Sequence, residues 1–289
     1  MRAVGALALL VIGCAHGPRS VPVPPDLQPE VERVRRAATR LVALERLQAS
    51  AARLVPAQRR GADPPVLGMI ALRTSWAPSG SVAFVVQRPE GGLQVLYEAR
   101  VLDELRSIAG FRRLGDPRPL VAEEQEIWQA RETVLAAFVE GRCAEQLDVL
   151  VLPREAPDSS FDVYPLPAPR VRWAGAQVMV KRGTYMEVSR DGSMELVVTG
   201  HQRFHVSPDG KRVLERVALS GECQVRSLDH VRGNGDVIEL MDRSVDLPNE
   251  AQLLESAVLG WNFRITSRRG VWEVSAGELS LVSDSSPAR

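Results

Sequence analysis

The feature that most constrains the fold is a long amphipathic pattern near the start of the chain. From Pro29 to Leu54, apolar residues recur every three or four positions, with glutamate and arginine between them, until Pro56. This spacing places the apolar side chains on one face of an α-helix about 40 Å long. Because the stripe keeps no strict heptad, we expect it to pack on the chain's own sheet, and docking on a partner helix is the alternative.

An apolar segment precedes this helix. Residues 1–13 carry one basic residue, Arg2, and an uncharged apolar run that ends directly before Cys14. Such a run is a secretory signal, and it is too short to span a bilayer, which takes about 20 apolar residues. The stretch from Val11 to Cys14 resembles the lipobox of bacterial lipoproteins, in which a small residue precedes a cysteine that is acylated. An ordinary secretory signal with an incidental cysteine is the alternative.

The lipobox resemblance implies a location for the protein. It implies acyl chains such as palmitate on Cys14, removal of residues 1–13, and a chain tethered to a membrane of the cell envelope. Ala15 stands where many lipoproteins of the inner membrane carry aspartate, so the resemblance favours the outer membrane, facing the periplasm or the cell surface. Residues 14–28 are rich in proline and predict an extended spacer that lifts the folded body off the bilayer.

The cysteines can be divided between lipid and disulfide. The chain has three of them, an odd number. If Cys14 carries lipid, Cys143 and Cys223 remain as a pair in a compartment that permits disulfides. Their bond would close a loop of about 80 residues and stabilise the fold by about 3 to 4.5 kcal/mol. Two buried free thiols are the alternative.

The part of the chain between the long helix and Cys143 predicts a mixture of strands and helices. Val66–Leu72, Ser81–Gln87 and Leu93–Tyr97 have strand character and are separated by turn-rich stretches, which indicates a series of hairpins. Helical patterns follow near Val101–Ile108 and, more strongly, from Pro119 to Val139, where acidic residues at the start suit the helix dipole.

Beyond Cys143 the pattern becomes rich in strands. Residues 147–152 alternate as a strand, whereas the proline-rich stretch 156–169 predicts a loop or a sheet edge. Glycines then recur every eight to ten residues, which is typical of a β-meander. Near the end, Asn249–Leu259 predicts a helix with Asn249 at its cap, followed by a hairpin around Ser267–Arg269.

The phrase Val-Ser-x-Asp-Gly occurs twice, ending at Gly192 and at Gly210. Asp-Gly between extended runs favours a two-residue hairpin turn, because glycine tolerates positive φ. Residues 207–211 also resemble the strand-turn motif of certain periplasmic β-propellers, but a propeller needs several copies of a blade of about 40 residues. We therefore interpret the two phrases as hairpin turns at the same end of one sheet.

Together these patterns predict an α+β fold with a long N-terminal helix, a small hairpin and helix region and a C-terminal antiparallel β-meander. The stretch from Gly141 to Val274 also looks like a family of uncharacterised bacterial envelope proteins, a resemblance that implies no reaction. The expected divisions are a signal peptide over 1–13, a proline-rich linker over 14–28, a helix-rich α+β region over 29–140, a β-rich domain over 141–282 and a frayed tail over 283–289.

Side chains that would carry catalysis form no recognised pattern. His201 and His205 lie four residues apart, but in a strand they would stand about 13 Å apart, too far for one zinc ion, and we interpret them as a solvated strand face. A pairing of Cys143 with His230 is the alternative to the disulfide. The sequence holds no nucleophile elbow and no nucleotide-binding loop, so it predicts no catalytic residue, no metal site and no cofactor.

Charge balance and the N-terminal segment set the expected function. The 36 basic and 36 acidic residues give no net field that would attract nucleic acid. The expected partners are a membrane, through the lipid, and a protein that binds the helix from Pro29 to Leu54. The leading hypothesis is a lipid-anchored envelope protein that acts as a binding or structural module rather than as an enzyme. The alternatives are an envelope hydrolase with a dispersed site and an accessory subunit of an envelope machine.

Overall fold

The computed structural model describes residues 20–73, 80–89, 91–102, 107–138, 147–154, 160–167, 170–173, 176–179, 193–227 and 237–282. Within these residues the fold is mostly β, with its strands in four sheets. The helices are α1 (Gln28–Ala52), α2 (Val55–Gln58), α3 (Ala122–Ala137) and α6 (Glu250–Leu259).

Each of the four sheets is described by the order of its hydrogen-bonded strands. Sheet A has the order β1 (Ser20–Val21), β17 (Glu278–Val282), β16 (Gly270–Ser275), β15 (Asn262–Ser267) and β14 (Val237–Met241). Sheet B has the order β2 (Val66–Arg73), β3 (Gly80–Gln87), β4 (Leu93–Leu102) and β5 (Ser107–Pro119). Sheet C has the order β12 (Val213–Ala218), β11 (Gln202–Val206), β7 (Phe161–Pro167) and β6 (Leu147–Pro153). Sheet D has the order β13 (Val225–Ser227), β10 (Ser193–Val197), β8 (Arg170–Trp173) and β9 (Ala176–Met179).

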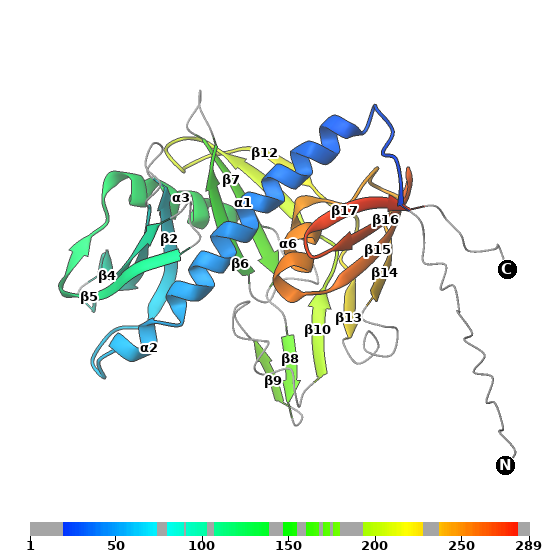
Figure 1. The fold of residues 1–289 in the computed structure, drawn as a ribbon. Coiled ribbons are helices and arrows are strands. Elements are labelled where there is room, and N and C mark those ends of the chain that lie inside the picture. The colour runs from blue at the N-terminus through cyan, green and yellow to red at the C-terminus, as the bar shows by residue number, and fades with distance from the viewer. Residues whose placement is uncertain are drawn as a thin grey trace, which may run out of the picture.

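Helix α1 crosses the molecule and joins its two ends. Figure 1 shows it running from sheet A on the right to sheet B on the left. Val31 and Val34, in its first half, belong to the core beneath sheet A, whereas Leu41 and Leu44 belong to the core of sheets B and C. The apolar stripe of α1 is therefore buried by the chain itself, and one rigid helix connects both cores.

Arginines on α1 fix the helix to the elements beside it. The Nη2 atoms of Arg35, Arg40 and Arg46 donate to the backbone oxygens of Leu279, Pro153 and Ala257 at 2.8, 2.6 and 3.1 Å. These acceptors lie on or next to sheet A, sheet C and α6. Since a charged donor strengthens a hydrogen bond, the three contacts set the position of α1 along its length.

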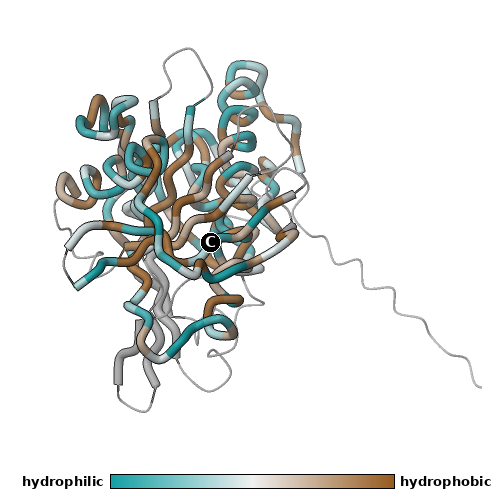
Figure 2. The backbone as a smooth tube through the Cα atoms, turned by 90° about the vertical axis from the view of Figure 1, so that its left-hand side faces the viewer, coloured by the Kyte–Doolittle hydropathy of each residue, from teal (hydrophilic) through white to brown (hydrophobic). Residues whose placement is uncertain are grey.

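Sheets B and C are covered on both faces. Along β3, Phe84 and Val86 face the core that contains α1, whereas Ala83 and Val85 face the core that contains α3. The strands accordingly read as continuous apolar runs, because successive side chains point to opposite faces and both faces are buried. Figure 2 shows these apolar strands in brown at the centre of the molecule, with helices that alternate between brown and teal.

The fold class expected from the sequence is wrong in two respects. A helix is found at Gln28–Ala52, but the region after it is a four-stranded antiparallel sheet rather than a small hairpin and helix region. The second half is not one antiparallel meander, because its strands are divided among sheets A, C and D, and β14 runs parallel to β15 with α6 between them. Gly200, with φ of 86°, leads from sheet D to sheet C rather than reversing the chain within one sheet.

Two local expectations fail because pairing with distant strands outweighs local pattern. The helix expected near Val101–Ile108 is absent from the described residues, because Val101 is buried at the end of β4, opposite Gly80 of β3. The proline-rich stretch expected to be a loop or an edge contains β7, an interior strand of sheet C. Pro165 and Pro167 fit there because β11 pairs only with residues 161–163 of β7, so the prolines have a strand on one side alone.

The segment expected as a free spacer is partly docked on the body. Ser20 and Val21 form β1 and pair with Val282 and Leu281 of β17. Val21 and Val23 then pack against the core beneath sheet A. Only residues 15–19 therefore separate Cys14 from the sheet.

Candidate functional site

A buried ion cluster begins at the N-terminus of α6. As expected from the sequence, Asn249 caps this helix, its Oδ1 atom accepting from the backbone N–H groups of Ala251 and Gln252 at 3.0 and 3.1 Å. Glu250 is the first helical residue and its side chain is fully buried. A carboxylate at this position is favoured by the positive end of the helix dipole.

Glu250 draws side chains from three further elements, and we call the four residues the Glu250 cluster. Its Oε1 atom accepts from Nη1 of Arg203 on β11 at 2.7 Å, from the hydroxyl of Tyr164 on β7 at 3.3 Å and from Nη1 of Arg33 on α1 at 3.5 Å. Burial, and then the negative charge of Glu250, raise the pKa of Tyr164 above its usual value. The cluster ties α1 and α6 to sheet C, and its charges are compensated within the fold.

A second buried cluster centres on Asp63. Its carboxylate accepts from Nη2 of Arg113 at 2.6 Å and from the hydroxyl of Tyr97 at 2.7 Å, and also from the backbone N–H of Arg60 at 2.8 Å. The hydrogen bond from Arg113 holds the pKa of Asp63 well below its usual range. Burial, followed by the bond to Asp63, raises the pKa of Tyr97 to about 12. The cluster fixes the segment before β2 onto β4 and β5.

A third cluster lies where β5 leads into α3. Arg118 donates from Nη1 and Nη2 to the two carboxylate oxygens of Glu124, both at 2.7 Å, and from Nε to Glu98 at 2.7 Å. Glu124, whose side chain is fully buried, also accepts from the backbone N–H of Val121 at 2.9 Å. This paired geometry is the strong form of an ion pair, and it anchors the start of α3.

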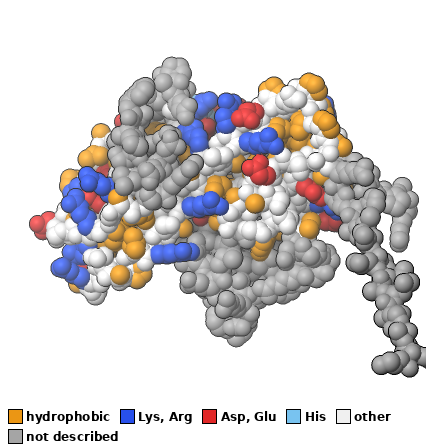
Figure 3. Space-filling view, in the orientation of Figure 1, with side chains coloured by type: hydrophobic (Ala, Val, Ile, Leu, Met, Phe, Trp, Pro, Cys, Tyr) orange, Lys and Arg blue, Asp and Glu red, His pale blue; other side chains and the backbone are white. Residues whose placement is uncertain are grey.

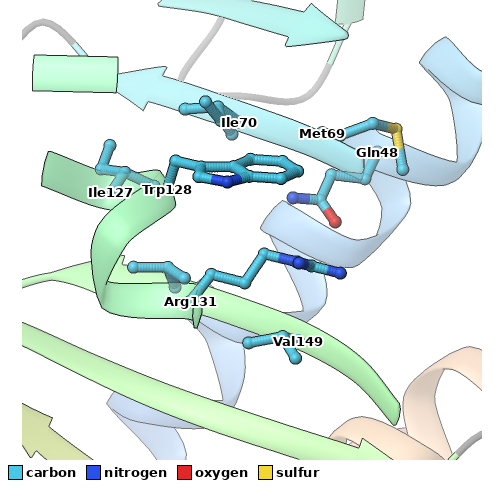
Figure 4. Close-up of a pocket in the computed structure, with 9 residues that line it drawn as sticks. Gln48, Met69, Ile70, Ile127, Trp128, Arg131 and Val149 are labelled. Carbon is cyan, nitrogen blue, oxygen red and sulfur yellow. The ribbon is translucent and has the colours of Figure 1, made fainter. Parts of the chain in front are cut away.

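A small cavity lies between the edges of sheets B and C, with α1 on one side and α3 on the other. Figure 4 shows the Arg131 guanidinium between Trp128 and Val149, directed toward Gln48. The Arg131 Cζ atom lies 4.9 Å from the centre of the Trp128 ring, which is a cation–π contact. The cavity measures about 10 Å³, and because one water needs about 10 to 15 Å³, it has no room for a substrate.

A larger hollow lies at the end of sheet A, and we call it the arginine hollow. It measures about 440 Å³ and is lined by Arg243, Thr266, Ser267, Arg268, Gly270, Val271 and Val282. Arg243 comes from the loop after β14, and Arg268 comes from the turn between β15 and β16. Val282 pairs with Ser20, the first described residue of the chain. The hollow is therefore next to the start of the described chain.

The two histidines that the sequence singled out lie close together in the chain but differ in environment. His205 is on β11, with Nδ1 3.6 Å from a carboxylate oxygen of Asp162. His201 is fully buried, so the expected solvated face is wrong for this residue. Among the described residues, no group of three or more His, Cys, Asp or Glu side chains is placed to hold a metal ion.

The predicted lipid and disulfide sites can be located only in part. Cys14, Cys143 and His230 lie outside the described residues. Cys223 is a disulfide-bonded cysteine in the structure, and its pairing with Cys143 stays a prediction.

Of the two expected hairpin turns, the one at Gly192 lies outside the described residues. Gly210 belongs to a loop of six residues between β11 and β12, which is longer than the expected two-residue turn.

Comparison of the chain with protein-family models, with curated proteins and with solved structures finds no match. Among the described helices, none is long and apolar enough to cross a bilayer.

The ion clusters were missed by sequence reasoning because their members are far apart in the chain: Arg33 and Glu250 are separated by 217 residues. The arginine hollow was missed for the same reason, since three segments supply its lining.

Proposed function

We propose that this chain is a lipid-anchored protein of the cell envelope that works as a binding or structural module. The resemblance of Val11–Cys14 to a lipobox carries the anchor, and the pairing of Ser20 and Val21 with β17 supports a short connection, because it fixes the start of the body six residues after Cys14. An acyl group on Cys14 would then be connected to a rigid sheet rather than to a free tail. Ala15 favours the outer membrane as the place of anchoring.

The short connection sets the distance between the body and the bilayer. Six extended residues span at most about 20 Å. The protein is thus held close to the membrane surface, with sheet A nearest, rather than raised on a long proline-rich spacer. In Figure 1 the dark-blue start of the described chain lies beside β17, at the end away from sheet B.

The chemistry of the described residues supports a module rather than the alternative of a hydrolase. The carboxylates of Asp63, Glu124 and Glu250 each accept hydrogen bonds from arginine and serve the packing of the fold. In the arginine hollow, the Ser267 hydroxyl donates to the backbone oxygen of Asp246 at 2.8 Å and accepts from Trp272 Nε1 at 3.1 Å. Within the described part of the chain, the hydrogen-bond partners of this hydroxyl include no base that would make it a nucleophile.

A protein partner on α1 would have to use the polar side of the helix, because the apolar stripe is buried. Arg36 and Arg46 are exposed on that side. Figure 3 shows basic side chains, with acidic ones among them, spread over the face that α1 crosses. Such a face suits a partner with an acidic surface.

The anchor is tested by labelling cells with palmitate. The wild-type chain should incorporate label and sediment with membranes. Cys14→Ser should incorporate no label and should not sediment with membranes. Equal labelling of the two proteins would refute the proposal. Arg100→Ala, on the exposed side of β4, is the matched control and should label as the wild type does.

A further inference from the structure

We propose that the arginine hollow binds the phosphate headgroup of an anionic phospholipid in the bilayer that holds the chain, an inference that rests on the lipid anchor proposed above. The position of the hollow is the first argument. Val282 lines the hollow and pairs with Ser20. Since at most about 20 Å of chain joins Ser20 to Cys14, an acylated chain keeps this hollow within reach of the headgroups.

The face on which the hollow opens is the second argument. In sheet A, Ile265, Trp272 and Leu281 point into the core with α1 and α6. Thr266, Val271 and Val282 are their neighbours along the strands and therefore point to the opposite face. They lie in one row across β15, β16 and β17, and none of the described helices covers this row. At about 440 Å³, the hollow has the size of a small-ligand site.

The third argument is charge. Arg243 is exposed and forms no ion pair with any described residue. Arg268 uses Nε to bind Asp246 at 2.7 Å, and its other two guanidinium nitrogens make no hydrogen bond within the described part of the chain. Guanidinium groups bind phosphate oxygens in a paired geometry, so these two arginines suit a phosphodiester. Arg268 and Arg269 each form an ion pair with an aspartate, Asp246 at 2.7 Å and Asp26 at 2.6 Å, so the uncompensated positive charge at the hollow is that of Arg243.

At the hollow, Asp246 is paired with Arg268 and the Asp242 carboxylate accepts backbone N–H groups, which leaves Arg243 as the exposed cation without a carboxylate partner among the described residues. Arg264 contacts Glu273 at 2.8 Å and Glu239 at 3.9 Å, two residues along the strands from the row of Thr266. The row formed by Glu239, Arg264 and Glu273 therefore carries two acids and one base, and it lies farther from Ser20 than the row of Thr266 does. An anionic surface would repel this row and attract the end with Arg243 and Arg268, which orients the body on the bilayer.

The loop that presents Arg243 is fixed before any ligand binds. The two carboxylate oxygens of Asp242 accept from the backbone N–H groups of Gly221 at 2.8 Å and Ser244 at 3.2 Å. The backbone N–H of Asp242 donates to the Thr266 oxygen at 2.9 Å. Because both neighbours of Arg243 are held, the backbone of the loop loses little conformational entropy when Arg243 binds a ligand.

The test uses the acylated full-length protein in lipid nanodiscs and follows amide hydrogen exchange by mass spectrometry. One set of discs contains phosphatidylcholine alone, and the other contains phosphatidylglycerol as well. Exchange in residues 242–246 and 266–271 should be about fivefold slower in the anionic discs, which is the gain expected from one arginine near an anionic surface. Arg243→Glu should abolish this difference, and Arg100→Glu, an exposed arginine on sheet B, should preserve it.

The outcomes separate this inference from the anchor. If palmitate labels the wild type and the two kinds of disc give equal exchange in these residues, the headgroup site is refuted and the anchor stands. Equal exchange in Arg243→Glu and Arg100→Glu would refute it as well. If inorganic phosphate produces the same slowing in phosphatidylcholine discs, the occupant is a free anion and not the lipid. Equal palmitate labelling of wild type and Cys14→Ser would instead refute the proposed function.

Discussion

The Arg203 Nη1 atom lies 2.7 Å from Glu250 Oε1, with the arginine side chain 21% exposed and the glutamate fully buried. The pair joins β11 of sheet C to the first residue of α6. Arg203 and Glu250 are separated by 47 residues in the sequence. Burial of a charge is costly, and the cost is offset here by Arg203, Arg33 and the helix dipole together.

We expect that removal of one partner of this pair strongly lowers the free energy of unfolding. Arg203→Met should lower the free energy of unfolding by about 3 to 5 kcal/mol, because it leaves the Glu250 carboxylate buried with weaker compensation. The double variant Arg203→Met with Glu250→Leu should lose less than the sum of the single variants. Urea unfolding measures all three proteins, and additive losses would contradict the coupling.

The loop between β11 and β12 predicts a glycine requirement at one position. A Cβ atom on Gly210 would lie 2.3 Å from the backbone oxygen of Glu126 on α3, and Gly210 has φ of 72°. Gly210→Ala should therefore destabilise the protein by about 3 kcal/mol, from left-handed strain together with the clash.

Gly92 offers the matched control for Gly210. Its φ is 88°, but nothing lies within 4 Å of the position of its Cβ atom. Gly92→Ala should cost only the strain of about 1 to 2 kcal/mol. Thermal unfolding of both variants tests the close approach of the loop to α3, and equal losses would show that the approach is absent in solution.

The Asp63 cluster predicts a loss of stability in alkali. The pKa of Tyr97 is raised from 10.0 to about 12 in the folded protein, so the folded state holds this proton more tightly than the unfolded chain does. The resulting stabilisation is complete below pH 10 and disappears as the pH rises toward 12. Tyr97→Phe should show a shallower decline of unfolding free energy over this interval, and an unchanged decline would contradict the assignment.

The cysteines predict a mobility change on reduction. If Cys143 and Cys223 are bonded, protein isolated without reductant should migrate more slowly on denaturing gels after reduction, and Cys14→Ser should keep this shift. Cys223→Ser should lower the free energy of unfolding by about 3 to 4.5 kcal/mol in the chain-entropy account. Detection of free thiols at Cys143 and Cys223 in protein isolated without reductant would contradict the bond.

Local signals in the sequence were sufficient for elements whose ends carry their own chemistry. Asn249 could be recognised as the cap of α6, and the turn around Ser267–Arg269 does join β15 to β16. The amphipathic spacing placed a helix over most of the residues of α1. In each case the deciding interactions lie within a few residues of one another.

The assignment of strands to sheets depends on contacts that no local window contains. Between β10 and β11 the chain passes through Gly200, whose absent Cβ would lie 3.2 Å from the Cys223 Cα atom. The next strand, β11, pairs with β7 and not with β10, and the glycine spacing alone does not reveal this partner. The Glu250 cluster and the arginine hollow likewise depend on segments that meet only in the finished fold.

The pairing of β1 with β17 also bears on how the protein matures. Among the described strands β1 pairs with β17 alone, so it can pair only after residues 278–282 have been synthesised. A product that stops before Glu278 would leave Trp272 and the core beneath it exposed beside a loose N-terminal segment. Proteolysis near Ser20 should therefore distinguish unfinished chains from finished ones, because only a finished chain forms the two residue pairs between β1 and β17.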